Sequence, residues 1–211
     1  YPEGGERSLI GVVTGRQLRF GQLPADLGCV VCNVSTLNAI YRAVCKTEPL
    51  MGRLFTVSGD AVANPHTLFV RIGTSCSELL EAAGGIKPGS EARKILCGGP
   101  MMGIAMSTLD APVAKNNNAL TVLASDEVEL AEQQMTSCLR CGRCGHVCPI
   151  GLVPQMMAEA AERQDYERYE KKLYGLDCIA CGSCTYICPA KRPLMQLFKQ
   201  TKTAIMAAKR K

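Results

Sequence analysis

The 211-residue sequence predicts an α+β fold, in which a small β-sheet domain is followed by a helical, cysteine-rich domain. Two observations support this prediction. Segments rich in β-branched and aromatic residues lie between turn signals in the middle of the chain, as in strands. Eight of the thirteen cysteines form two copies of one pattern in the last third, among segments of helical periodicity.

The middle of the chain has the order of a small β-grasp domain, which is a hairpin, a helix and a further strand. Ser75 and Glu78 form a capping-box signature for the helix, which should end at Gly84 and Gly85. The predicted elements are a strand over 52–62, a strand over 66–73, a helix over 76–84 and a strand over 93–100.

The segments around the cysteines are predicted to be helical. Ser125 caps a predicted helix over 126–137, and Pro154 suits the first turn of another. Helical spacing predicts two apolar faces, which consist of Met156, Met157, Ala160 and Ala161, and of Leu194, Leu197, Phe198 and Ile205. The basic tail is interpreted as a solvated helix end, with docking to an acidic partner as the alternative. It contains Lys199, Lys202, Lys209, Arg210 and Lys211.

The two cysteine copies share the pattern C-x2-C-x2-C-x3-C-P. Three thiolates converging from one tight loop fit a [4Fe-4S] cubane, and Gly142 and Gly182 stand where each loop must turn sharply. In two-cluster proteins with this pattern, the fourth cysteine binds the other cluster. The predicted ligands are Cys138, Cys141, Cys144 and Cys188 for cluster 1, and Cys178, Cys181, Cys184 and Cys148 for cluster 2.

Composition favours iron–sulfur clusters over other uses of cysteine. Structural zinc sites require neither a third cysteine nor a trailing Cys-Pro, and disulfide scaffolds are usually small and secreted. The sequence shows no secretory signal pattern and no apolar run of about 18 residues, so we expect an intracellular chain without a membrane span. Two clusters of about −2 each nearly cancel the formal charge of +5, and we expect no nucleic-acid binding.

Together these segments resemble the C subunit of the Rnf complex, a membrane-bound, ion-translocating ferredoxin:NAD oxidoreductase. "YPEGGERSLIGVVTGRQLRFGQLPADLG" resembles the later part of its flavin-binding domain, and "NVSTLNAIYRAV" resembles the helix that follows. "LFTVSGDAVANPHTLFVRIGTSCSELLEAAGG" and "GGPMMG" resemble its β-grasp domain of the soluble-ligand-binding type. The cysteine motifs resemble its helical two-cluster ferredoxin domain.

The resemblance implies a domain organisation and a function. The implied function is electron transfer through two [4Fe-4S] clusters, on the cytoplasmic side of the membrane, with the other subunits of the complex and indirectly with ferredoxin as partners. No residue acts as a catalytic base, because the clusters carry the chemistry. The implied domains are a flavin-domain remnant with its helix at 1–50, a β-grasp domain at 51–110, a connecting strand and helix at 111–135, and a ferredoxin domain at 136–211.

The resemblance also concerns the flavin. By resemblance, Glu6, Asn33 and Thr36 match positions near the flavin in related complex I subunits. Those subunits have a glutamate at the position that Ser35 occupies in this chain. The glycine-rich segments that cradle flavin and NADH should precede Tyr1. We therefore expect FMN and NAD(H) binding only in a longer form, and no NADH oxidation by this chain alone.

Two other functions stay open. A flavin and iron–sulfur cobalamin reductase shares the order of β-grasp and two-cluster domains, although "CPAKRPL" and "GGPMMG" favour the Rnf family. A β-grasp binding module with structural metal is the third hypothesis. Redox titration separates it from the others, because a structural metal site does not take up electrons reversibly.

Overall fold

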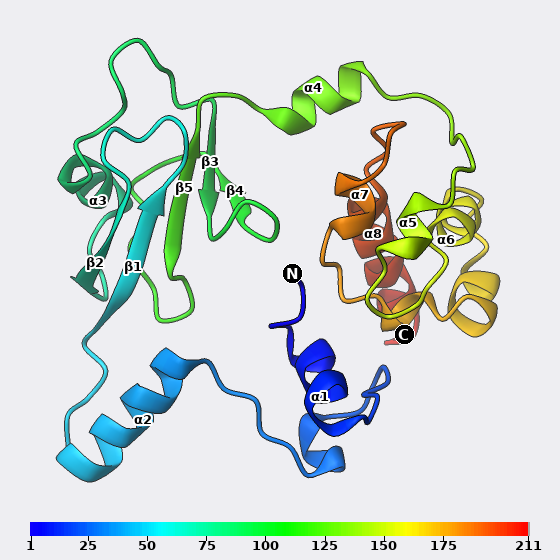
Figure 1. Ribbon diagram of the computed structural model, residues 1–211, viewed down its shortest axis with the longest axis horizontal. Coiled ribbons are helices and arrows are strands. Elements are labelled where there is room, and N and C mark those ends of the chain that lie inside the picture. The colour runs from blue at the N-terminus through cyan, green and yellow to red at the C-terminus, as the bar shows by residue number, and fades with distance from the viewer. Residues whose placement is uncertain (211) are drawn as a thin grey trace. The chain divides into compact units, whose positions relative to one another are not determined.

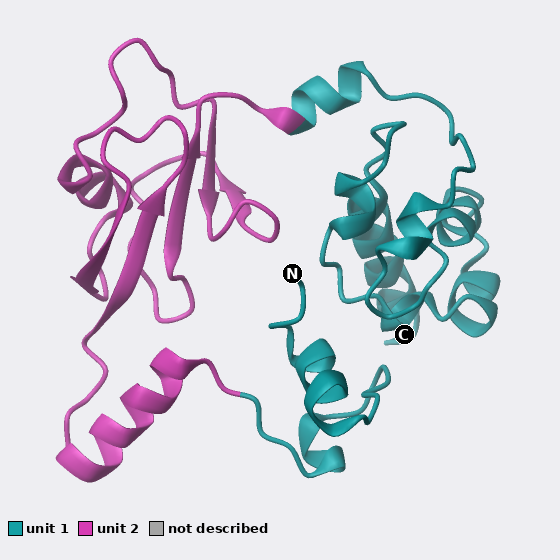
Figure 2. Ribbon diagram, viewed as in Figure 1, with its two compact units in different colours: residues 1–31, 128–211 teal, residues 32–127 magenta. Residues whose placement is uncertain are grey.

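The computed structural model describes residues 1–210 and has a mixed α+β fold (Figure 1). It divides into two compact units (Figure 2). The sheet unit comprises residues 32–127. The cysteine unit joins residues 1–31 to the part of the chain that begins at Val128, although these two segments are far apart in the sequence.

The sheet unit is built on five strands. Its elements are α2 (Val34–Lys46), β1 (Gly52–Ser58), β2 (His66–Arg71), α3 (Cys76–Ala82), β3 (Lys94–Cys97), β4 (Ile104–Met106) and β5 (Ala119–Leu123). The strand order is β2-β1-β5-β3-β4. The central pair, β1 and β5, is parallel, and the other neighbouring pairs are antiparallel.

The core of the sheet unit follows from the alternation of side chains along β1. Phe55 and Val57 are fully buried, whereas Leu54 on the opposite face of β1 is 58% exposed, because successive side chains of a strand point to opposite faces. Leu79 and Leu80 of α3 join the same buried cluster as Phe55 and Val57. The hairpin, the helix and β5 therefore enclose one apolar core.

Gly59 allows the chain to leave β1 close to β5. Its φ angle is +119°, a conformation that side-chain-bearing residues rarely adopt. A Cβ atom at this position would lie 1.9 Å from the carbonyl oxygen of Val122 in β5. Glycine at this position therefore permits the close approach of the two strands at the end of β1.

The predicted hairpin, helix and strand are present, but the sheet contains more than the sequence patterns indicated. The Ser75 hydroxyl accepts a hydrogen bond from the Ser77 N–H at 3.1 Å, which confirms Ser75 as the cap of α3. The predicted strand over 93–100 is limited to Lys94–Cys97. Strand β5, which the sequence interpretation placed in a connecting segment, lies at the centre of the sheet.

The cysteine unit is helical. Its elements are α1 (Glu6–Thr14), η1 (Pro24–Leu27), α4 (Glu127–Gln133, whose first residue belongs to the sheet unit), α5 (Arg143–His146), α6 (Pro154–Glu162), η2 (Arg168–Lys172), η3 (Gly175–Asp177), α7 (Ser183–Tyr186) and α8 (Leu194–Ala208). Pro154 occupies the first turn of α6, as predicted. Helix α4 ends at Gln133, earlier than the predicted limit of 137.

Helices α6 and α8 form the core of the cysteine unit. Leu194, Phe198 and Ile205 of α8 are buried, which confirms three of the four residues predicted for that face, and Leu197 packs against them while partly exposed. On the apolar face predicted for α6, Met157, Ala160 and Ala161 are buried, whereas Met156 is 38% exposed. Even α8, with 15 residues, is too short to cross a bilayer, and none of the helices at residues 1–210 has the length and apolarity of a span.

Candidate metal centre

The two cysteine loops have the same backbone conformation. Arg140 and Ala180 both have φ of 53°, although neither is glycine. Two residues later, Gly142 and Gly182 have φ of 76° and 84° and begin the short helices α5 and α7. The repeat in the sequence is therefore a repeat in backbone conformation, and each loop turns at the glycine where the spacing predicted it.

The first loop contributes to a cavity that four cysteines line. Cys138, Cys141 and Cys144 come from this loop. The fourth cysteine, Cys188, comes from the end of the second motif. The other lining residues are Leu139, Gly142, Gln155, Pro189, Ala190, Arg192 and Leu194. The structure thus brings together residues 44 to 50 positions apart.

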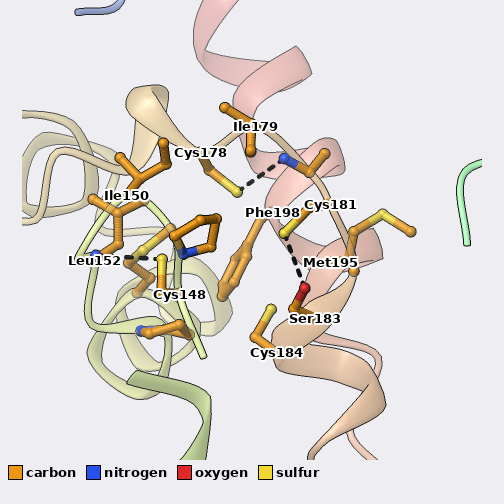
Figure 3. Close-up of a pocket in the computed structure, with 15 residues that line it drawn as sticks. Cys148, Ile150, Leu152, Cys178, Ile179, Cys181, Ser183, Cys184, Met195 and Phe198 are labelled. Atoms are coloured by element: carbon orange, nitrogen blue, oxygen red, sulfur yellow. Dashed lines mark hydrogen bonds between the residues drawn. The ribbon is translucent and has the colours of Figure 1, made fainter. Parts of the chain in front are cut away.

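The second loop contributes to a matching cavity. Its sulfur atoms, from Cys178, Cys181 and Cys184, point toward a common space together with that of Cys148 from the first motif (Figure 3). The remaining walls are mainly apolar and include Ile150, Leu152, Met157, Ile179, Met195 and Phe198. Cys148 and Cys188 thus each line the cavity at the loop of the other motif, and the cross-ligation that the spacing rule predicts stays a prediction.

Burial disfavours the thiolate form at three of the cysteines that line the two cavities, Cys184 and Cys178 in the second and Cys144 in the first. Burial raises the pKa of Cys184 to about 12, and the neighbouring Cys178 and Cys181 contribute to this rise. Burial also raises the pKa of Cys178 and of Cys144. A metal core compensates for this cost, because cysteine binds metal as the thiolate and loses its proton on binding.

Backbone N–H groups are aimed at the sulfur atoms. The Leu152 N–H donates to Cys148 Sγ at 3.3 Å, and the Ala180 N–H donates to Cys178 Sγ at 3.4 Å. Hydrogen bonds of this kind stabilise the charged form of the sulfur and influence the potential of a cluster. They also orient each thiol without using a side chain.

The buried hydroxyl of Tyr169 gives a further test of what fits this site. The side chain is fully buried, and its oxygen has no hydrogen-bond partner among the described residues. Burial raises the pKa of Tyr169, and the nearby Cys178 and Cys184 add to this effect. A group with sulfur acceptors at the cysteines is compatible with an unpartnered donor in this position.

The arrangement of the cysteines fits a core larger than one ion. Eight cysteines line two cavities, four to each. Four thiolates spread around a space of this kind are the ligand set of a [4Fe-4S] cubane.

Residues 1–31 are attached to the second loop by polar contacts. The Arg7 guanidinium donates to the Asp177 carboxylate at 2.9 Å and to the Asp177 backbone carbonyl at 2.7 Å. The Tyr1 hydroxyl donates to the Cys181 carbonyl at 2.7 Å, and the Phe20 N–H donates to the Asp177 carboxylate at 2.6 Å. The N-terminal segment therefore contacts the loop that carries three cysteines of the second cavity.

The residues predicted to lie near a flavin fall in different units. Glu6 is the first residue of α1 in the cysteine unit. Asn33 and Thr36 belong to the sheet unit, where the Asn33 side chain caps α2 by accepting the Ser35 N–H at 2.9 Å. The structure thus gives Asn33 a local role in α2, and the match of these three residues to a flavin site stays a prediction.

Sequence reasoning missed the residues that surround the second loop. Tyr1, Arg7 and Phe20 carry no motif, and Lys202 was assigned to a solvated tail. The structure contradicts that assignment for Lys202, which is partly buried. Lys209 is exposed at the end of α8 and pairs with Glu170. Lys211 lies outside the described residues. The internal repeat could have pointed to Lys202. The equivalent position of the first copy, 40 residues earlier at the end of α6, is Glu162, which has the opposite charge.

Three family models match consecutive parts of the chain. The Nuo51 FMN-binding domain matches residues 1–42, the SLBB domain matches residues 54–105, and the 4Fe-4S dicluster domain matches residues 137–194. The last match covers all eight cysteines of the two cavities. The order of the three matches agrees with the order expected from the resemblance.

Curated relatives cover nearly all of the chain. The C subunit of the proton-translocating ferredoxin:NAD(+) oxidoreductase complex of Clostridium ljungdahlii is 44% identical over 99% of this chain. The C subunit of the Na(+)-translocating ferredoxin:NAD(+) oxidoreductase complex of Acetobacterium woodii is 41% identical over the whole chain. The chain is homologous to the C subunit of the Rnf complex. The C subunit of the ion-translocating oxidoreductase complex of Yersinia pestis bv. Antiqua, 41% identical over 98% of this chain, agrees.

The match covers less of the relatives than of this chain. The aligned region makes up 45% of the Clostridium ljungdahlii protein, 46% of the Acetobacterium woodii protein and 33% of the Yersinia pestis protein. The chain therefore spans less than half the length of these Rnf C subunits. Within that length it contains a 4Fe-4S dicluster domain and matches part of an FMN-binding domain.

Proposed function

We propose that this chain transfers single electrons through two [4Fe-4S] clusters as part of an ion-translocating ferredoxin:NAD oxidoreductase. The observation that carries the proposal is the pair of cavities with four cysteines each. The homology to the Rnf C subunits supports the wider assembly. When bound, such clusters supply reversible one-electron transfer at potentials that the surrounding protein sets.

The ligand sets of the proposal cross between the motifs. Cluster 1 is held by Cys138, Cys141, Cys144 and Cys188, and cluster 2 is held by Cys178, Cys181, Cys184 and Cys148. The crossing is supported by the cavity linings, in which Cys148 and Cys188 each join the other motif. In this arrangement, the chain orients the thiolates, keeps water from the apolar walls of the second cavity and holds both clusters in one helical unit.

The partners of the proposal are the other subunits of the membrane complex. Ferredoxin exchanges electrons with the chain indirectly, and FMN and NAD(H) are proposed as ligands of a longer form, with residues 1–42 matching part of its FMN-binding domain. We place the chain peripherally on the cytoplasmic side of the membrane. The names of the relatives support membership of a multi-subunit complex, while these finer assignments are our own.

The sheet unit is proposed to be a β-grasp module. Support comes from the order of the hairpin, α3 and β3, from the parallel central pair of β1 and β5, and from the SLBB match. The proposed limits of this module are 51–110, and β5 of the connecting segment completes its sheet, since β5 pairs with both β1 and β3. The flavin-domain remnant, the connecting segment and the ferredoxin domain retain their proposed limits of 1–50, 111–135 and 136–211.

The decisive experiment replaces a fourth ligand. Cys188→Ser should disturb the cluster held by the first motif and leave that held by Cys178, Cys181 and Cys184, with loss of up to about half of the iron. The clusters are followed by iron and sulfide analysis and by magnetic resonance of the anaerobically reduced protein. Cys45→Ser is the matched control, because Cys45 is exposed on α2 outside both cavities.

Two results would contradict the proposal. If Cys188→Ser and Cys184→Ser disturb the same cluster signal, the crossing is wrong. If the purified protein holds metal that does not accept electrons reversibly in a redox titration, the metal is structural and the electron-transfer function is wrong.

A further inference from the structure

The ammonium group of Lys202 is held against the backbone of the second cysteine loop. Its Nζ atom donates to the carbonyl of Leu176 at 2.8 Å, and it lies 3.4 Å from the carbonyl of Cys178 in a second, longer hydrogen bond. Both carbonyls belong to the segment that leads into the first cysteine of the second motif. A positive charge is therefore fixed beside one wall of the second cavity.

Residues 1–31 cover this charge. The Phe20 ring lies over the Lys202 ammonium, with Nζ 4.7 Å from the ring centroid, a distance at which cation–π attraction is favourable. Phe20 is held in turn by its N–H bond to Asp177, whose carboxylate also binds Arg7. The charge of Lys202 is consequently screened less by water than the charge of a lysine on an open surface.

The charges next to the second loop sum to a positive value. Arg7 and Lys202 are cationic, and Asp177 is the anion between them. Arg7 and Asp177 form a closed pair, with side chains 16% and 21% exposed. The net charge that remains near Cys178 is that of Lys202.

The first motif has the opposite residue at the equivalent position. The motifs begin at Cys138 and Cys178, 40 residues apart, and 40 residues before Lys202 stands Glu162 at the end of α6. Glu162 forms an ion pair with Arg192, so its charge is already balanced. The first loop carries its own cations, Arg140 and Arg143, where the second loop has Ala180 and Ser183. The contrast lies in how the charge is held: among the described residues, no lysine or arginine is recorded donating to a backbone carbonyl of residues 138–144, whereas Lys202 donates to the carbonyls of Leu176 and Cys178.

We propose that the fixed charge of Lys202 raises the reduction potential of the second cluster. The proposal rests on the iron–sulfur function proposed above. A reduced cluster carries one more negative charge than an oxidised one, and a fixed neighbouring cation stabilises the reduced form more. The charge of Lys202 acts through the electrostatic field at the loop, and its hydrogen bonds to the Leu176 and Cys178 carbonyls hold that charge in place.

The test measures the potential of each cluster in charge variants of Lys202. Lys202→Met should lower the equilibrium constant for reduction of the second cluster about tenfold, which lowers its reduction potential by about 59 mV for one electron. The potential of the first cluster should stay unchanged. Lys202→Arg should keep the potential near the original value, because it keeps the charge. Lys202→Gln keeps a hydrogen-bond donor without the charge and should behave like Lys202→Met.

The measurement is an anaerobic redox titration of the full chain, followed by magnetic resonance. Cys181→Ser identifies the signal of the second cluster, because it replaces a proposed ligand of that cluster alone. Lys199→Met is the matched control, since Lys199 is an exposed lysine one turn earlier on the same helix. It should shift neither potential.

Each outcome bears on the proposal. If Lys202→Gln keeps the original potential while Lys202→Met does not, the hydrogen bond matters and the charge does not, and the proposal is wrong. Equal shifts of both clusters would also overturn it, since they indicate a general change in structure. If Lys202→Met loses its clusters, Lys202→Gln and Lys202→Arg decide the question between them.

This test is separate from the test of the proposed function. If the wild-type chain shows no reversible reduction, the electron-transfer function fails before any variant is compared. If the clusters are reduced reversibly and none of the Lys202 variants shifts the second potential, only the inference about Lys202 fails.

Discussion

In the sheet unit, Phe55, Val57 and Val122 are completely buried in one cluster of strand and helix side chains. In the cysteine unit, the buried cluster of α6 and α8 is bordered by Cys144, Cys178 and Cys184, which face the two cavities. The sheet core is therefore closed by apolar side chains alone. The core of the cysteine unit shares its boundary with the proposed metal sites.

The two units therefore gain their stability in different ways. A hydrophobic core forms from the chain itself as apolar surface leaves water. A metal site that exists only in the folded state adds its binding free energy to folding, and for tight structural sites this can reach about 10 kcal/mol or more. We therefore expect the sheet unit to fold without metal and the cysteine unit to depend on it.

Removing the iron should have the largest effect. Chelation or exposure to air should unfold the cysteine unit, because the thiolates lose the cores that tie the two motifs together. We expect circular dichroism to show loss of helix and retention of strand, and limited proteolysis to cut between Glu129 and Lys202 and within residues 1–31. The segment from Leu54 to Gly103 should be spared.

Restoring iron and sulfide anaerobically should recover the helix signal. If both units become susceptible to protease together on iron loss, they form one cooperative unit, and the sheet unit does not fold independently of the metal.

A cavity in the sheet core should have the next largest effect. Phe55→Ala removes a fully buried ring and should lower the free energy of unfolding of the sheet unit by about 3 to 5 kcal/mol. The iron content should stay the same, because the ring belongs to the other unit. Denaturant unfolding measures the first quantity, and iron analysis measures the second.

Phe69→Ala is the matched control for this substitution. Phe69 lies on β2, which pairs with β1, but its side chain is 69% exposed. It should cost much less stability than Phe55→Ala. A loss of iron in Phe55→Ala at temperatures where the sheet unit stays folded would indicate coupling between the units.

The smallest effect is expected from the contact that holds residues 1–31. Arg7→Ala removes a charged hydrogen-bond pair with Asp177 whose side chains are mostly buried, and should cost about 1 to 3 kcal/mol. Hydrogen exchange should then increase in residues 1–31 and in the segment around Asp177, while the strands stay protected.

Arg42→Ala provides the comparison, because the Arg42–Glu48 pair has side chains that are 52% and 46% exposed and such pairs contribute little. If both substitutions change exchange equally, or if Arg7→Ala changes exchange only in the sheet unit, residues 1–31 are not held by the cysteine loop.

Local patterns in the sequence predicted much of this protein. Spacing predicted the loop turns at Gly142 and Gly182, the proline-led start of α6 and the buried face of α8, because each depends on neighbouring residues and on a regular period. The rule that assigns the fourth cysteine to the other cluster is also part of the pattern. Cys148 and Cys188 line the cavities that this rule requires, and their role as ligands stays a prediction.

Contacts between distant segments could be seen only in the tertiary structure. The position of β5 between β1 and β3 depends on pairings between segments far apart in the chain, which the local pattern of Ala119–Leu123 does not specify. In the sequence alone, Lys202 is one of several lysines in a basic C-terminal segment. Only the fold brings Lys202 to the carbonyls of Leu176 and Cys178 and places Phe20, from the other end of the chain, over its charge. The physical reason is that packing and partial removal from water are properties of the assembled surfaces and not of the residue.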